Sequence, residues 1–475
     1  MGTEWVDKDG VLEILEKQKR FGVFWDMGTG KTALLLGLID RKIFQGVNKI
    51  LIIAPKVVTL TTWQNEIRKW SNFNYLEPIV TLIEGAEDKR IKMLQNTGNT
   101  GICIHIISSS LFTWLVGKKV KKGNRVFFID NKYRPKYDMI IVDECSEFKD
   151  PKSNRFKGLK SILTDDTLLF LLSGTPFPNV REITPETKPK KYPNFLIGKY
   201  KKADEMYYAF YLLGIYKKSV YDFQRDFCFV LPYLKHTYFM HSQVYDALQE
   251  TISQYSLKKE LQLDVEKHEY KIYCKSDQQR FNALRKMLRV MTDDFKNIEA
   301  SSIAHMMNQA LQLANGFIYD EFHVPHRINH YKFEKLKELL ETIAGNVVIF
   351  YVFKEDKEYL LSNLPGARLY EGKQDEDDWN AGKIKYLILS PFSNKFGLNL
   401  QKGGNTVIWF GLVWSAEAII QGYRRIYRQG QEKDVEVYFL LAENTYDDYV
   451  YDVFVSKKAT IEGFLEYNQK TCNET

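Results

Sequence analysis

The stretch FWDMGTGKTALLLGLI, residues 24–39, decides the fold of this chain. An apolar run ends in a glycine-rich turn, and a helical pattern starts directly after that turn. Gly28 and Gly30 allow the backbone to approach a phosphate, Lys31 can reach the outer phosphates, and the Thr32 hydroxyl can ligate magnesium. A strand, a tight loop and a helix N-terminus in this order direct backbone N–H groups at an anion. The stretch therefore predicts a phosphate-binding loop.

The loop departs from the general pattern at one position. That pattern starts with a glycine five residues before Gly30, where this chain has Trp25. A lone Gly-Thr-Gly-Lys-Thr sequence also fits an ordinary turn before a helix, and the strand–loop–helix context favours the phosphate site. Thr29 belongs to the same predicted phosphate-binding loop.

Composition limits the class of protein. The chain has 475 residues, 44% of them apolar, and its length favours two or three domains with a large core. Its five cysteines form no C-x-x-C pair, which favours a reduced, intracellular protein. No apolar run is long enough to span a bilayer. We expect a cytoplasmic, soluble protein with no membrane partner, whose net charge of +7 suits a phosphate-rich partner.

Two series of short β-branched runs alternate with helical patterns. The first occupies residues 22–175 and the second residues 346–441. Runs without internal alternation are typical of strands buried on both faces of a parallel sheet. The sequence predicts an α/β fold with two lobes and helical insertions. The predicted segments are lobe 1 at 1–180, a helical insertion at 181–255, and lobe 2 at 256–475 with a helical insertion near 276–345.

Polar residues follow two later strands of the first series. Asp143 and Glu144 end the buried run YDMIIVDE, at the sheet edge where open α/β folds bind ligands. Asp143 would hold a metal and Glu144 would polarise the attacking water. The next run ends in Ser173, Gly174 and Thr175, whose hydroxyls could bond the acids and relay the state of the phosphate. Two solvated acids and a simple turn are the alternatives.

A basic helical pattern follows the second series. In SAEAIIQGYRRIYRQGQ, Gln421, Arg425 and Arg428 stand at i, i+4 and i+7, so the spacing predicts one helical face with an apolar face opposite. Arginine suits a phosphate site because its planar fork matches phosphate oxygens. A solvated basic face is the alternative.

The ordered set of motifs resembles a known family. DMGTGKT, IIAPK, VDECS, LLSGTPFPN, SNKFGLNLQ and QGYRRIYRQGQ are similar to motifs I, Ia, II, III, V and VI of superfamily-two helicases. TTWQNEIRKW, FKDPKSNRFKGLKSI and the terminal RQGQ resemble the Swi/Snf-type ATPases in particular, and the compact form is similar to motors of phages and mobile elements. The resemblance extends from about Phe21 to Tyr451.

The resemblance implies two RecA-like lobes, ATP and Mg²⁺ in the cleft between them, and double-stranded DNA across both. Lys31, Asp143, Glu144, Arg425 and Arg428 would be the catalytic residues. Gly397 and Gln421 would join the phosphate loop in binding ATP. Family members commonly translocate along duplex DNA without separating its strands.

Two departures from the family concern the ATP site. The family has an adenine-reading glutamine upstream of the loop, and Gln18, the glutamine nearest the loop, stands too close to it for that role. Ser146 replaces the histidine that usually couples motif II to motif III. We expect altered coupling with unchanged chemistry.

Nucleic-acid contacts are predicted by motif position. A protein that binds a nucleic-acid backbone needs cationic, hydroxyl and amide donors along a groove. The candidates are Lys56, Ser109, Ser110, Arg155, Asn394 and Lys395.

The leading hypothesis is an ATP-dependent translocase on double-stranded DNA that moves along or remodels DNA or protein–DNA complexes. The alternatives are a strand-separating helicase on DNA or RNA at forks or branches, and a scaffold with a dead ATPase, against which the intact motifs argue. We expect a monomeric motor whose targeting module, if any, is a separate subunit.

Overall fold

The computed structural model describes the chain as two compact units. The first comprises residues 1–261 with 394–397, and the second comprises residues 262–393 with 398–475. Within them, the described residues are 3–7, 9–26, 28–96, 101–122, 125–174, 176–177, 181–182, 200–202, 204–230, 238–259, 263–287, 289–291, 297–299, 303–392 and 398–456. None of the described helices combines the length and hydropathy that a membrane span requires.

The first unit is built on a seven-stranded sheet in which all paired strands are parallel. In spatial order the strands are β13 (Ser256–Lys259), β1 (Arg20–Trp25), β8 (Leu168–Leu172), β7 (Met139–Asp143), β2 (Lys49–Ala54), β4 (Cys103–Ser108) and β3 (Val80–Ile83). Strands β1, β2, β4, β7 and β8 confirm that apolar runs of the first series form parallel strands. Neither β3 nor the short, polar β13 was predicted.

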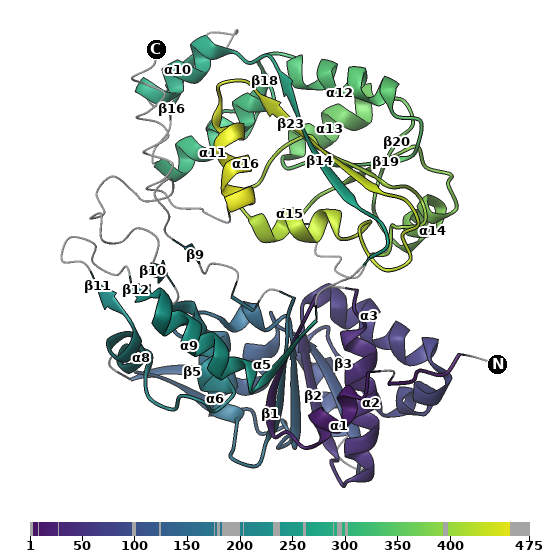
Figure 1. The fold of residues 1–475 in the computed structure, drawn as a ribbon, viewed down its shortest axis with the longest axis vertical. Coiled ribbons are helices and arrows are strands. Elements are labelled where there is room, and N and C mark those ends of the chain that lie inside the picture. The colour runs from purple at the N-terminus through teal and green to yellow at the C-terminus, as the bar shows by residue number, and fades with distance from the viewer. Residues whose placement is uncertain are drawn as a thin grey trace. The chain divides into compact units, whose positions relative to one another are not determined.

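Helices cover both faces of this sheet, as Figure 1 shows. One face bears α1 (Val11–Glu16), α2 (Lys31–Phe44) and α3 (Lys56–Lys69); the other bears α5 (Phe112–Val116), α6 (Asn154–Ile162), α7 (Tyr207–Leu212) and α9 (Ser242–Ser253). Along β2, Ile50 and Ile52 pack in the core beneath α1, α2 and α3, whereas Leu51 and Ile53 pack in the core on the opposite face of the sheet. This alternation explains why β2 reads as an unbroken apolar run. Additional elements are α4 (Glu87–Asn96) and the 3-10 helices η1 (Ser71–Ile79), η3 (Cys145–Phe148) and η5 (Asp204–Met206).

The segment after motif III is an integral part of the first unit. Besides α7 and α9 it contains α8 (Val220–Phe227) and a four-stranded sheet of β11 (Phe229–Val230), β12 (Tyr238–His241), β10 (Tyr200–Lys202) and β9 (Arg181–Glu182). Tyr207 and Phe223 pack in the core with ring centroids 5.6 Å apart. Residues 256–259 belong to the first unit, because β13 pairs with β1.

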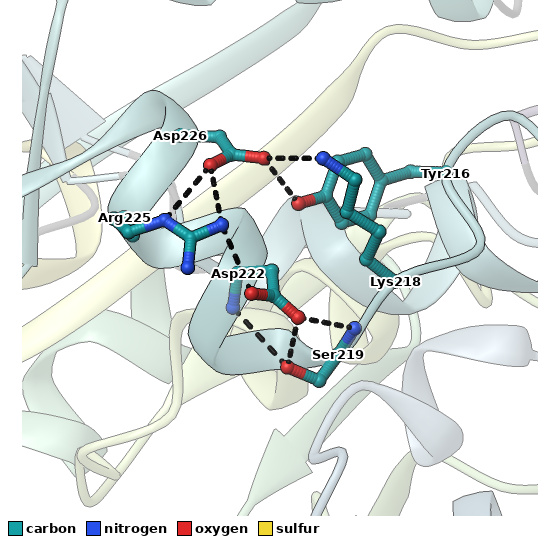
Figure 2. A network of polar contacts seen from close by, with 6 residues as sticks. All are labelled: Tyr216, Lys218, Ser219, Asp222, Arg225 and Asp226. Atoms are coloured by element: carbon teal, nitrogen blue, oxygen red, sulfur yellow. Dashed lines mark hydrogen bonds and ion pairs between the residues drawn. The ribbon is translucent and has the colours of Figure 1, made fainter.

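A polar network fixes α8 on the surface of this segment (Figure 2). Ser219 caps the helix: its Oγ accepts from the Asp222 amide at 3.2 Å and donates to the Asp222 carboxylate at 2.6 Å. Arg225 pairs with Asp222 and Asp226, and the Tyr216 hydroxyl donates to Asp226 at 2.7 Å. These contacts hold the helix so that its apolar side faces the core.

The second unit is built on a six-stranded sheet of parallel pairs. Its strands are β14 (Lys267–Cys274), β23 (Val435–Ala442), β22 (Thr406–Trp409), β19 (Val347–Phe350), β21 (Tyr386–Leu389) and β20 (Ala367–Leu369). Its helices are α10 (Gln278–Met287), α11 (Ile303–Ala314), α12 (Tyr331–Thr342), α13 (Lys354–Asn363), α14 (Lys373–Asn380), α15 (Ala416–Tyr423) and α16 (Tyr446–Ser456). Two short hairpins complete it, β15 (Arg289–Met291) with β16 (Asn297–Glu299) and β17 (Phe317–Tyr319) with β18 (Pro325–Arg327).

Candidate ATP site and nucleic-acid interface

The predicted phosphate loop connects β1 to α2 at the C-terminal edge of the first sheet. Gly28 and Gly30 have φ of 83° and 90°, the left-handed region that favours glycine. A Cβ built on Gly30 meets no atom within 4 Å, so space for a ligand lies beside the loop. The 14-residue helix α2 starts at Lys31, and its N-terminus carries the positive end of the helix dipole.

Side chains of the loop hold its own backbone. Lys31 Nζ donates to the carbonyl oxygens of Trp25 at 2.6 Å and Asp26 at 2.9 Å, and Thr29 Oγ1 donates to the Asp26 carbonyl at 2.7 Å. The Trp25 ring is buried in the core between the sheet and α2. Trp25 is therefore compatible with the loop at the position where the general pattern has glycine. Its carbonyl accepts a hydrogen bond from Lys31, and its ring packs in the core. Thr32 lies in the first turn of α2.

Asp143 lies at the end of β7, two strands away from β1, with β8 between them. Trp63 Nε1, from the middle of α3, donates to Asp143 Oδ2 at 3.0 Å. Burial raises the pKa of Asp143 to about 6, with Glu144 raising it further, while Lys31 and the Trp63 hydrogen bond lower it. Lys31 therefore lies close enough to Asp143 to act on its carboxylate electrostatically.

Glu144 follows in a left-handed conformation, with φ 57° and ψ 60°. A non-glycine residue pays for this geometry with about 1–3 kcal/mol of backbone strain, and such strain concentrates at functional sites. Its Oε1 accepts from Ser146 Oγ at 2.8 Å and from Ser173 Oγ at 2.6 Å. Ser173 follows β8, so the predicted hydrogen bond between motif III and the acid pair is present. Ser146 bonds the same oxygen as Ser173.

A tyrosine from α7 lies behind the acids. The Tyr208 hydroxyl donates to the Pro176 carbonyl at 2.6 Å and lies 3.4 Å from Cys145 Sγ, so the residue links the loops after β7 and β8. Tyr208 is fully buried, and burial raises its pKa well above the usual value. Gly174 follows Ser173 directly, and Thr175 lies outside the described residues.

The arginines of motif VI belong to the second unit, and their local structure differs from the prediction. The sequence predicts one helical face for Gln421, Arg425 and Arg428, but α15 ends at Tyr423. The Arg425 carbonyl accepts from the Leu400 amide at 3.0 Å instead of continuing the helix. The prediction of a single helical face is therefore wrong, since a long-range backbone contact outcompetes the helical ladder.

Arg425 and Arg428 are nevertheless held firmly in the second unit. Arg425 is 6% exposed, and burial lowers its pKa to about 10, so it stays charged at neutral pH. Its guanidinium lies 5.8 Å from the Phe350 ring centroid. Arg428 Nη1 donates to the Leu398 carbonyl at 3.0 Å. The apolar side of the motif packs into the core through Ile419 and Ile426, as predicted.

Four predicted nucleic-acid contacts lie in the first unit. Lys56 is exposed at the start of α3, directly after β2, and Ser109 and Ser110 follow the neighbouring strand β4. Ser110 is exposed, whereas Ser109 is 4% exposed and its amide donates to the Ala54 carbonyl. Arg155 lies on α6, 3.8 Å from the Glu147 carboxylate of η3. Gly397, Asn394 and Lys395 lie outside the described residues.

Sequence reasoning missed two residues of the site. Trp63 reads as an ordinary apolar position of a helix, and Tyr208 as one of many aromatic residues after motif III. A buried indole or phenol needs a hydrogen-bond partner, but sequence does not indicate which one. Gln18 lies just before β1, at the opposite end of this strand from the phosphate loop.

Comparison with known proteins places these motifs in a family. The family model described as SNF2-related domain matches residues 12–316. The protein p41 of Acyrthosiphon pisum secondary endosymbiont phage 1 is 27% identical, over 94% of this chain and 95% of its own length. A SWI/SNF-related matrix-associated actin-dependent regulator of chromatin (subfamily A-like protein 1) from Xenopus tropicalis is 22% identical over 98% of this chain, which spans 45% of that protein.

A solved structure, the SWI2/SNF2 ATPase core of Sulfolobus solfataricus in complex with dsDNA, is 18% identical with a TM-score of 0.39, over 94% of this chain and 88% of that one. The family model covers well over half of this chain. The protein therefore belongs to the SNF2-related domain family.

Proposed function

We propose that the protein is an ATP-dependent translocase on double-stranded DNA, with its hydrolytic site at the C-terminal edge of the first sheet. One observation carries the proposal: Glu144 is strained and held by hydroxyls from its own loop and from the loop after β8. A carboxylate oriented in this way is suited to position and polarise a water for attack on a γ-phosphate. The hydrogen bond from Ser173 of motif III to Glu144 would link hydrolysis to a second segment of the lobe.

Lys31 and the loop amides would bind the phosphates. Lys31 Nζ rests on two carbonyl oxygens of the loop, and it would exchange them for phosphate oxygens without leaving the loop. Arg425 and Arg428 would offset charge on the transferring phosphoryl group, with Gln421 nearby in the same motif. Burial of Arg425 supports this role, because a cation held by its surroundings needs little reorganisation.

Magnesium fits the first unit's residues. A threonine hydroxyl and a carboxylate, Thr32 and Asp143, are oxygen ligands that Mg²⁺ accepts, and a cation beside Asp143 would offset the burial that raises its pKa. No cluster of three or more His, Cys, Asp or Glu side chains occurs among the residues the structure describes. Mg²⁺ takes most of its ligands from phosphates and water. Bound Mg²⁺ would neutralise charge on the phosphates.

Duplex DNA is the proposed partner. The relatives include a protein named as a regulator of chromatin. Lys56 and Ser110 follow neighbouring strands of the first sheet, at the same edge as the ATP loop. Donors at that edge suit sequence-independent contacts to a phosphate backbone.

The test is the rate of ATP hydrolysis with no nucleic acid, single-stranded DNA, duplex DNA and duplex RNA. Duplex DNA is expected to stimulate most, and Lys31→Ala to lower the stimulated rate by about 100-fold or more. Lys17→Ala, which changes an exposed lysine before β1, is the matched control and should leave the rate unchanged.

Two further assays separate translocation from strand separation. A translocase displaces a triplex-forming strand from duplex DNA in an ATP-dependent way and leaves forked duplexes intact. Unwinding of forks without triplex displacement would favour the strand-separating helicase. Stimulation by RNA alone would overturn the proposal.

A further inference from the structure

One segment of the first unit carries a large excess of positive charge. Residues 117–137, GKKVKKGNRVFFIDNKYRPKY, contain eight of the 67 Lys and Arg residues but one of the 60 Asp and Glu residues. This gives the segment a net charge of +7. The net charge of the full chain is also +7, so the charges of all other residues balance.

The segment begins with an antiparallel ribbon, β5 (Gly117–Lys122) paired with β6 (Arg125–Asp130). The ribbon forms its own two-stranded sheet, separate from the seven-stranded sheet of the first unit. Six residues a strand give it a length of about 20 Å. Its register pairs Gly117 with Asp130 at the base and Lys122 with Arg125 at the far end.

The register of the ribbon pairs one cationic residue with another at its far end, where Lys122 stands directly opposite Arg125. Lys118 and Lys119 occupy successive positions of β5, and successive positions of a strand belong to opposite faces. Asp130, the acid of the segment, pairs with Arg134 at 3.1 Å beyond the end of the ribbon.

The base of the ribbon is anchored close to the predicted nucleic-acid contacts. The five-residue helix α5 connects Ser110 and Leu111 to the start of β5. The Asn131 amide donates to the Val116 carbonyl at 3.2 Å, and Phe128 packs against the buried core that includes Val116. The ribbon is thus a fixed extension of the lobe at the sheet edge where Ser110 lies.

We propose that the β5–β6 ribbon is a second contact of the motor with duplex DNA, in which its lysines bind backbone phosphates. The proposal rests on the proposed function, and it names a surface outside the helicase motifs. Charge complementarity commits the ribbon to this partner: a two-stranded ribbon fits a DNA groove, and its cations can pair with phosphates without reading sequence.

The experiment measures affinity for a duplex of random sequence as a function of salt concentration. The test variant of the full chain replaces four lysines of β5 together, Lys118→Gln, Lys119→Gln, Lys121→Gln and Lys122→Gln. Each lost phosphate contact lowers the slope of log K against log[salt] by about 0.9, so the slope is expected to fall by about 2 to 4. The corresponding four Lys→Arg changes should restore it.

The matched control removes four exposed lysines elsewhere in the first unit, Lys17→Gln, Lys19→Gln, Lys89→Gln and Lys92→Gln. Because the net charge change is the same, a general loss of electrostatic attraction would affect both variants equally. The proposal expects the slope of the control to stay within about 1 of the unchanged chain. Equal losses in both variants would overturn it.

Two outcomes distinguish this proposal from the proposed function. If the unchanged chain shows no stimulation of ATP hydrolysis by DNA, the proposed function fails. If the chain is stimulated but the β5 variant keeps the original salt slope and melts at the same temperature, the ribbon proposal alone fails. Lysines on a ribbon can also deter edge-to-edge pairing. That role predicts aggregation of the variant with an unchanged salt slope, which also refutes the ribbon contact.

Discussion

Replacing Asp143 with asparagine should stabilise the nucleotide-free protein while it abolishes ATP hydrolysis. The pKa of Asp143 is raised from 3.8 to about 6, mainly because the surrounding protein displaces water from the carboxylate. An ionised carboxylate in this position is unfavourable relative to the same group in an unfolded chain. The asparagine side chain would keep an oxygen acceptor for the Trp63 indole and remove the charge.

The magnitude follows from the pKa difference. A shift of about two units at about 1.4 kcal/mol a unit corresponds to about 3 kcal/mol, and the partial exposure of Asp143 reduces this to about 2 kcal/mol. Because the folded-state pKa is raised, the favourable contribution is complete below pH 3.8 and is lost as the pH rises through about 6. Asp143→Asn should therefore be more stable than the unchanged protein at pH 8, by a difference that shrinks below about pH 6.

Calorimetry of the ligand-free chain measures this difference. The two compact units can unfold separately, so each transition is followed, and one transition should rise by about 5 °C at pH 8 and by about half as much at pH 5. Asp166→Asn, at a side chain that is 90% exposed, is the control and should change nothing. Trp63→Phe removes a hydrogen bond that lowers the pKa of Asp143. In a plot of the ATP hydrolysis rate against pH, the rise on the acid side should therefore move to higher pH. A loss of stability in Asp143→Asn at pH 8, or an equal gain at every pH, would refute the reasoning.

The shared acceptor on Glu144 predicts that Ser146→Ala and Ser173→Ala each lower kcat by about tenfold, with little effect on the KM for ATP. The double variant should lose more than the product of the single losses, and a multiplicative loss in steady-state kinetics would contradict a shared anchor. In the second unit, Lys332 Nζ donates to Asp447 at 2.6 Å with both side chains buried, so Lys332→Met should lower the free energy of unfolding by about 3–5 kcal/mol. Combining it with Asp447→Leu should recover much of this loss in urea unfolding, and a loss below about 1 kcal/mol in the single variant would contradict the assigned burial of charge.

The sequence predicted the parts of the molecule that depend on local pattern. Apolar runs such as KILIIA predicted strands of both sheets, because a strand buried on both faces must be apolar at every position. The glycines at 28 and 30 predicted the phosphate loop, since their left-handed φ values are unfavourable for other residues. Strands with polar faces at sheet edges, such as β13, were missed because they lack this pattern.

The predicted helix at Arg425 shows where local pattern fails. Spacing of three and four residues favours a helix, yet the Arg425 carbonyl bonds to Leu400, a residue distant in sequence. Periodicity reports only which residues share a face if a helix forms, and it contains no information about a competing partner.

The sequence by itself determined the strands that are buried on both faces, the phosphate loop, the acids and their order along the chain, because each depends on the properties of neighbouring residues. Tertiary structure alone decided that Ser146 and Ser173 converge on one oxygen of Glu144 and that Trp63 holds Asp143. It also decided that α7 delivers Tyr208 behind them. The physical reason is that hydrogen-bond partners are selected by the burial that brings distant segments together, and a polar group in the core must take whichever partner the packing supplies.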